Sequence, residues 1–185
     1  GSARSVYAMD LFFVLALAAT AAYGLNHQQQ RRRIVLLAQH LHPYQIERLM
    51  ETLTQGYLRA MGEQDPERRQ QVLNLLASSE AQLSEQFERF AADFRRVPAP
   101  LARASRLALG LPFATQLLPA ATFDMREAID VHARGIARVA RNDAGLSPRD
   151  KAFTMTAELL LMQHTCHWFC KSKTVASART LARHQ

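Results

Sequence analysis

The feature that most constrains this chain is a run of fifteen residues without a charged side chain, Leu11 to Leu25 (LFFVLALAATAAYGL). Extending the run back to Val6 gives about twenty residues interrupted only by Asp10. A helix that crosses a bilayer needs roughly 20 mainly apolar residues, whereas stretches of about 10–14 are more often buried core helices. The run lies between these lengths, so a membrane anchor and a soluble core helix both remain open.

The residues after the run favour the anchor. A polar stretch, Asn26 to Gln30, leads to Arg31, Arg32 and Arg33. Arginines beside an apolar segment favour the cytoplasmic side of a membrane. Ala19-Thr20-Ala21 resembles the small-residue cleavage site of a signal peptide, but the basic charge then lies on the wrong side. We expect a single-pass protein of a bacterial inner membrane, with its C-terminal domain in the cytoplasm.

Length and composition limit the domain organisation. The chain has 185 residues, 48% of them hydrophobic, which suits one globular domain plus an anchor. We expect a tag or extension over residues 1–10, an anchor with a basic flank over 11–30, and one α-helical domain over 31–185. Two cysteines are too few for a disulfide framework. A net charge of +7 indicates an anionic partner, but the arginines are spread along the chain.

The pattern after Arg33 is helical throughout and predicts an all-α bundle of about five to six helices. Residues 34–41 either continue the first helix or begin another. Pro43 suits a first helical position, and Gly62 is placed to end that helix. Asp65-Pro66 then begins a helix with an apolar stripe that ends before Pro98. The stripe consists of Val72, Leu76, Leu83, Phe87, Phe90 and Phe94, and Glu80, Glu85, Glu88 and Arg89 are expected on the solvent side.

The second half predicts two further helices and one segment that is harder to assign. Residues 107–123 carry no charge but contain two prolines, which indicates a buried, kinked connection, or alternatively a re-entrant membrane segment. A helix is expected from Phe123 to Asn142, capped by Thr122. A capping box at Ser147 begins the last helix, which reaches to about Ser177. Its middle is apolar on nearly every side, which predicts a central, buried helix.

The most conspicuous cluster of metal-binding residue types lies in that last helix. His164, Cys166, His167 and Cys170 fall within seven residues, but helix geometry turns the histidines and cysteines about 110° apart. The spacing matches neither the usual zinc patterns nor a haem-attachment motif. A metal site built from His164, His167 and His132 stays open as an alternative to histidines and cysteines packed in the core. We expect no cofactor and no disulfide.

A second candidate is a basic stripe formed by Arg134, Arg138 and Arg141 on one helix face. Together with Arg31 to Arg33 it is a candidate contact for anionic lipid or a partner. Acidic residues interleave with it and base-reading groups are lacking, so nucleic acid is an unfavoured partner.

No motif assigns the chain to a family, and none points to catalysis. We therefore expect a membrane-anchored binding or scaffold protein, attached through Leu11–Leu25 and capable of forming a homo-oligomer. Two alternatives are a metal- or haem-binding protein and a soluble helical regulator that binds nucleic acid or a small ligand.

Overall fold

A computed structural model describes residues 2–105 and 122–171 of the chain. In these residues the protein is all-α, as predicted. The helices are α1 (Ser2–Leu41), α2 (Ile46–Gly62), α3 (Pro66–Leu75), α4 (Ala77–Phe94), α5 (Ala99–Ala102), α7 (Met125–Arg141) and α8 (Pro148–Lys171). Most of the uncharged segment 107–123, and the predicted end of the last helix near Ser177, lie outside the described residues.

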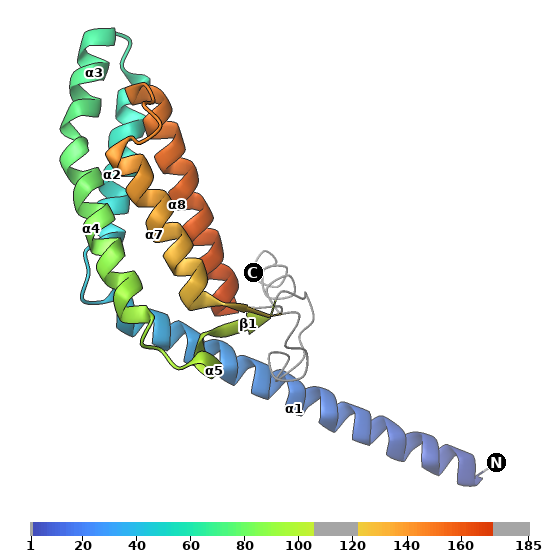
Figure 1. The fold of residues 1–185 in the computed structure, drawn as a ribbon. Coiled ribbons are helices and arrows are strands. Elements are labelled where there is room, and N and C mark those ends of the chain that lie inside the picture. The colour runs from blue at the N-terminus through green and yellow to red at the C-terminus, as the bar shows by residue number, and fades with distance from the viewer. Residues whose placement is uncertain (1, 106–121, 172–185) are drawn as a thin grey trace.

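Helices α2, α4, α7 and α8 lie side by side and form a bundle, and α3 extends α4 along the same side (Figure 1). Helix α1 crosses one end of this bundle, where it contacts α4 and α8, and then continues away from it. Only the last part of α1 therefore belongs to the globular body. The boundary expected at residues 30 and 31 is not a break in the helix, and residues 2–10 are its first turns.

The core is aromatic at the end of the bundle where α1 enters. Phe87, Phe90 and Phe94 of α4 are fully buried, as their apolar stripe predicted. Phe94 meets Phe169 of α8 edge to face, with ring centroids 6.2 Å apart, and it meets His40 of α1 at 5.3 Å. Edge-to-face pairs of this kind add to the stabilisation from burial. This contact fixes α1 to the bundle.

The stripe does not lie on one helix, as expected, but on two. Helix α3 ends at Leu75 and α4 begins at Ala77, with Leu76 between them. The side chain of Leu76 packs against Gly56 of α2, where an added Cβ would lie 2.5 Å from Leu76 Cδ2. At the break, the Leu76 side chain therefore occupies the space that any side chain at position 56 of α2 would fill.

The predicted solvent position of Glu80 is wrong. Its side chain is buried, and its carboxylate accepts a hydrogen bond from Tyr57 of α2 and forms an ion pair with Lys151 of α8. Glu80 lies three residues before Leu83 and seven before Phe87, so the helical period itself places it on the core side.

The helix ends mostly follow the expected signals. Gly62 ends α2, and Asp65 caps α3 by accepting a hydrogen bond from the backbone N–H of Glu67 at 3.0 Å. Pro43 is not a first helical residue, because it lies in the turn between α1 and α2, which begins at Ile46. That turn is closed by the N–H of Tyr44, which donates to the carbonyl of Leu41 at 3.0 Å.

Two three-residue strands, which the sequence pattern did not predict, form an antiparallel ribbon: β1 (Arg103–Ser105) and β2 (Thr122–Asp124). Strands this short have no room for a recognisable alternation. Because Thr122 pairs within the ribbon, it does not cap α7. The cap is Asp124, whose Oδ1 accepts from the N–H of Arg126 at 2.9 Å.

Helix α8 is not the buried, central helix that its composition predicted. Met155 and Leu159 are in the core, but Phe153, Leu160 and Leu161 are 54%, 60% and 57% exposed. The described helices α1, α2, α3 and α7 contact α8 on its other sides. Its start is as expected, since Ser147 Oγ accepts from the N–H of Asp150 at 3.2 Å.

Candidate functional site

The most unusual surface among the described residues is the free part of α1, which is the apolar stretch of residues 6–25 that precedes the bundle. Its large apolar side chains are exposed, and six of them are 60–70% exposed: Leu11, Phe12, Phe13, Val14, Leu15 and Leu17. The most apolar window of the helix has no buried residue. At 1.5 Å per residue, residues 6–25 extend about 30 Å, the thickness of a bilayer's hydrocarbon core. Helix α1 is thus long and apolar enough to span a membrane, and the structure places this segment outside the core.

The free part of α1 and the bundle are joined by one unbroken helix. After the polar residues 26–30, α1 reaches the bundle at Leu37, which is 6% exposed. One turn later, Nδ1 of His40 lies 2.8 Å from the carbonyl oxygen of Leu36, while its ring contacts Phe94. The helix therefore emerges from the body in a fixed direction.

The three predicted basic residues at this junction have different surroundings. Arg33 is half-buried: its Nη2 donates to the carbonyl of Arg103 at 3.5 Å, and its guanidinium lies 5.8 Å from the ring centroid of Phe169. Burial lowers the pKa of Arg33 from its ordinary value. Arg31 and Arg32 are exposed. Arg33 thus helps to hold α1 against β1 and α8.

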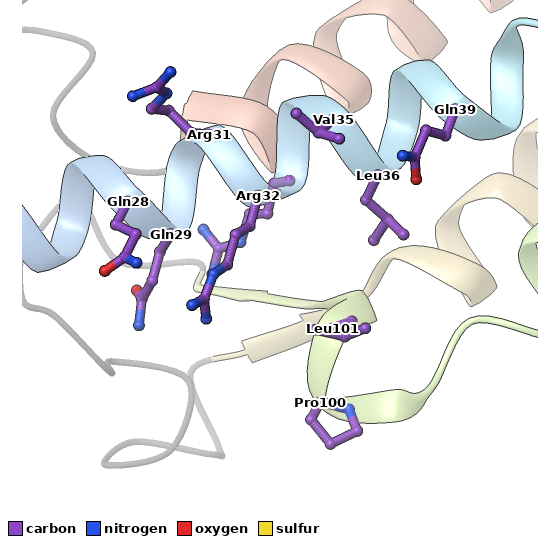
Figure 2. A pocket seen from close by; sticks show the side chains of 10 residues that line it. Gln28, Gln29, Arg31, Arg32, Val35, Leu36, Gln39, Pro100 and Leu101 are labelled. Atoms are coloured by element: carbon purple, nitrogen blue, oxygen red, sulfur yellow. The ribbon is translucent and has the colours of Figure 1, made fainter.

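A cavity of about 580 Å³ opens between α1 and α5 at this junction. From α1, the side chains of Gln28, Gln29, Arg32 and Leu36 extend toward the side where Pro100 and Leu101 lie (Figure 2). Arg31 also borders the cavity, but its guanidinium extends to the other side of the helix. On a helical wheel Arg32 lies about 40° from Leu36, whereas Arg31 lies about 140° from it.

The chain segments around this cavity are rich in positive charge. The sequence has no acidic residue between Asp10 and Glu47, and none between Asp93 and Asp124. Among the residues that the structure describes, those that line the cavity include no carboxylate. The cavity thus combines cationic and amide donors at one end with apolar walls at the other, which suits a ligand that is both anionic and apolar.

The second basic group, on α7, is mixed in charge. Arg134 and Arg138 are exposed, and Arg141 pairs with Asp143 at 3.1 Å. All three border a groove of about 450 Å³ between α4 and α7, which also contains Glu88 and the ion pair of Arg95 with Asp130, 2.8 Å apart. Because this groove has charges of both signs, it attracts an anionic ligand less strongly than the cavity beside α1 does.

The structure does not bring the three candidate metal ligands together. His132 Nε2 lies 2.7 Å from Thr165 Oγ1, while His164 is exposed beside Trp168 and His167 is half-buried. Among residues 2–105 and 122–171, no group of three or more His, Cys, Asp or Glu side chains could hold a metal ion. The geometry gives the metal-binding alternative no support.

Neither Cys166 nor Cys170 is part of a disulfide. Burial raises the pKa of the Cys166 thiol to about 12, and its Sγ lies 3.7 Å from Met162 Sδ. A thiol with so high a pKa is a poor nucleophile and a poor metal ligand at neutral pH. Cys166 therefore behaves as a small apolar residue.

The sequence interpretation missed one charged cluster, formed by Tyr57, Glu80 and Lys151. It joins α2, α4 and α8 deep in the bundle. The spacing of Glu80 to Leu83 and Phe87, three and seven residues, could have revealed the buried position of Glu80.

No protein-family model matches the chain, and comparison with curated proteins and with solved structures gave no significant match.

Proposed function

We propose that this chain is a membrane-anchored helical binding or scaffold protein without catalytic activity. In this proposal α1 crosses a bacterial inner membrane once, and the bundle lies on the cytoplasmic side. The observation that carries the proposal is the free part of α1, an apolar helix of membrane-spanning length with none of its most apolar window buried.

The energetics favour lipid as the environment of this segment. Moving one large apolar side chain out of water stabilises it by about 1.5–3 kcal/mol, and at least six such side chains are exposed on residues 11–17. The backbone hydrogen bonds of a helix are satisfied internally, so the segment can enter hydrocarbon without unpaired polar groups. Because Arg31, Arg32 and Arg33 follow the apolar segment, the positive-inside bias supports a cytoplasmic bundle.

The binding role rests on the exposed apolar side of α8. Phe153, Leu160 and Leu161 are spaced as i, i+7 and i+8, so they lie on one side of the helix. Exposed apolar side chains gathered on one face are typical of protein contact surfaces. An anchored bundle with such a face is suited to hold a second protein at the membrane.

Extraction of membranes from cells that express the full chain tests the anchor. We expect detergent, but not alkaline carbonate, to release the protein. Replacing Val14 and Leu17 with arginine places two charges near the centre of the span, each costing about 2.5–3.5 kcal/mol, and should make the protein extractable by carbonate. The intact mass of the extracted protein separates a retained anchor from a cleaved signal peptide.

The matched control replaces Leu58 and Leu75 with arginine. These residues are 69% and 77% exposed, against 61% and 70% for Val14 and Leu17, but they lie on the bundle. The control should remain detergent-dependent. A wild-type chain found in the soluble fraction without detergent would contradict the proposal.

A further inference from the structure

We infer that the cavity between α1 and α5 is a binding site for the headgroup of an anionic phospholipid, with Arg32 as the ligand of the phosphate. This inference rests on the proposed function, because it needs α1 to be in a membrane. It goes beyond that function by naming one residue and one class of lipid.

The position of the cavity fits the depth at which headgroups lie. Gln28 is three residues beyond Leu25 and Arg32 is seven, which corresponds to about 4.5 and 10 Å along the axis of α1. If Leu25 marks the edge of the hydrocarbon, the polar layer covers roughly the next 5–8 Å. The two glutamines therefore lie in the layer that contains lipid phosphates. The base of Arg32 lies a few ångströms beyond this layer, and because side chains on a helix lean toward its N-terminus, the guanidinium of Arg32 can reach back into it.

The chemistry of the lining also fits. An arginine guanidinium presents paired N–H donors that match two phosphate oxygens. The side-chain amides of Gln28 and Gln29 add neutral donors for phosphate or glycerol oxygens. The apolar end, made by Leu36, Pro100 and Leu101, lies on the side of Arg32 away from the membrane and closes the cavity behind the phosphate.

The fold selects Arg32 from the three consecutive arginines. Arg33 also lines the cavity, but its guanidinium is held by the carbonyl of Arg103 and lies against the ring of Phe169. The guanidinium of Arg31 extends away from Pro100 and Leu101, and that of Arg32 extends toward them (Figure 2). Arg31 and Arg32 have equal charge and similar exposure, but only the guanidinium of Arg32 extends to the side of Pro100 and Leu101.

This difference provides the experiment. The full chain in detergent is titrated with phosphatidylglycerol or with phosphatidylcholine of the same acyl chains, and bound lipid is counted by native mass spectrometry. We expect the wild type to prefer phosphatidylglycerol. Arg32→Gln should weaken that binding by about tenfold or more, because a charge-assisted hydrogen bond is lost. Arg31→Gln removes the same charge and should stay within about twofold of the wild type.

The apolar wall has its own test. Leu101 is 49% exposed, so Leu101→Glu should fold normally while placing a carboxylate in the cavity. It should weaken phosphatidylglycerol binding at least as much as Arg32→Gln does. Leu75→Glu, at an exposed position of α3, is its control and should bind like the wild type.

Three results would overturn the inference. They are an equal loss in Arg31→Gln and Arg32→Gln, no preference for the anionic lipid, and competition by inorganic phosphate at the lipid's own concentration. The first indicates diffuse attraction, and the last indicates a site for free phosphate. Carbonate extraction is the independent check on the anchor: Arg32→Gln should remain detergent-dependent even when its lipid binding is lost.

Discussion

The ammonium nitrogen of Lys151 lies 2.6 Å from Oε2 of Glu80, the one charged side chain that is buried among the residues described. The other carboxylate oxygen accepts a hydrogen bond of 2.9 Å from the Tyr57 hydroxyl. Burial and the neighbouring carboxylate raise the pKa of Tyr57 far above its ordinary value, so the phenol keeps its proton and remains a donor. One carboxylate thus joins α2, α4 and α8.

Replacing Lys151 with methionine should destabilise the bundle strongly. The substitution keeps the length and most of the volume of the side chain but leaves the Glu80 carboxylate without its counter-ion. Removing one partner of a buried pair costs about 3–5 kcal/mol. Urea denaturation of the full chain in detergent, followed by the helical circular dichroism signal, measures the change in the free energy of unfolding.

An exposed ion pair is the control for this prediction. Arg89 and Glu85 lie 2.6 Å apart, the same distance, but their side chains are 63% and 62% exposed. Arg89→Met should therefore cost less than about 1 kcal/mol. If the two substitutions had equal effects, the Glu80 cluster would not be a buried structural element.

The sequence predicted the bundle well because its helix signals are local. Asp65 before a proline and Gly62 at a helix end need no tertiary contact to act, and both have the expected roles. The break at Leu76 is different, because there the side chain packs on Gly56, twenty residues away in the sequence. Local periodicity carries no information about such a contact.

The candidate site was predictable as a region but not in its geometry. The apolar run and the arginines after it are visible in the sequence, and the structure places both where α1 leaves the bundle. Arg31, Arg32 and Arg33 are equivalent in the sequence. They differ only because Phe169, Arg103 and Leu101, all distant in the chain, meet α1 at this point.

His132 should make the stability of the bundle depend on pH. The hydroxyl of Thr165 donates to the carbonyl of Leu161, so the ring Nε2–H of His132 donates to Thr165 Oγ1. Burial lowers the pKa of His132 below its ordinary value of 6.5, although the carboxylate of Glu158 opposes this shift. The unfolded chain then binds the proton more tightly, so stability is complete above about pH 6.5 and falls as the pH drops below it.

Urea denaturation between pH 7.5 and 5.5, about one unit on either side of that ordinary value, measures this dependence. The wild type should lose stability toward the acid end. His132→Gln keeps a hydrogen-bond donor for Thr165 and removes the titration, so its loss over the same range should be smaller. Identical slopes for the two proteins would contradict the assignment to His132.

Cys166 should be slow to alkylate in the folded protein. With a pKa raised to about 12 by burial, only a very small fraction of the thiol is ionised at pH 8. In a Cys170→Ser background, iodoacetamide should react with Cys166 about 1,000-fold more slowly at pH 8 than in denaturant, where the pKa returns to an ordinary value. Mass spectrometry of timed samples gives both rates. Similar rates would show that Cys166 is not buried in solution.

Three consecutive leucines on α8 give the sharpest test of which side of this helix belongs to the core. Leu159 is 4% exposed, whereas Leu160 and Leu161 are 60% and 57% exposed. Leu159→Ala should lower the free energy of unfolding by about 2–4 kcal/mol, because it empties a packed site. Leu160→Ala and Leu161→Ala should each change it by less than about 0.5 kcal/mol. Urea denaturation of the three variants compares identical substitutions within one helical turn.

Equal losses at all three positions would mean that the exposed face of α8 is covered in solution, as in a homo-oligomer. A loss of stability that grows on dilution would identify that case. If only Leu159 affects stability, Leu160 and Leu161 are exposed in the isolated protein, and this face of α8 is open to the partner that the proposed function requires.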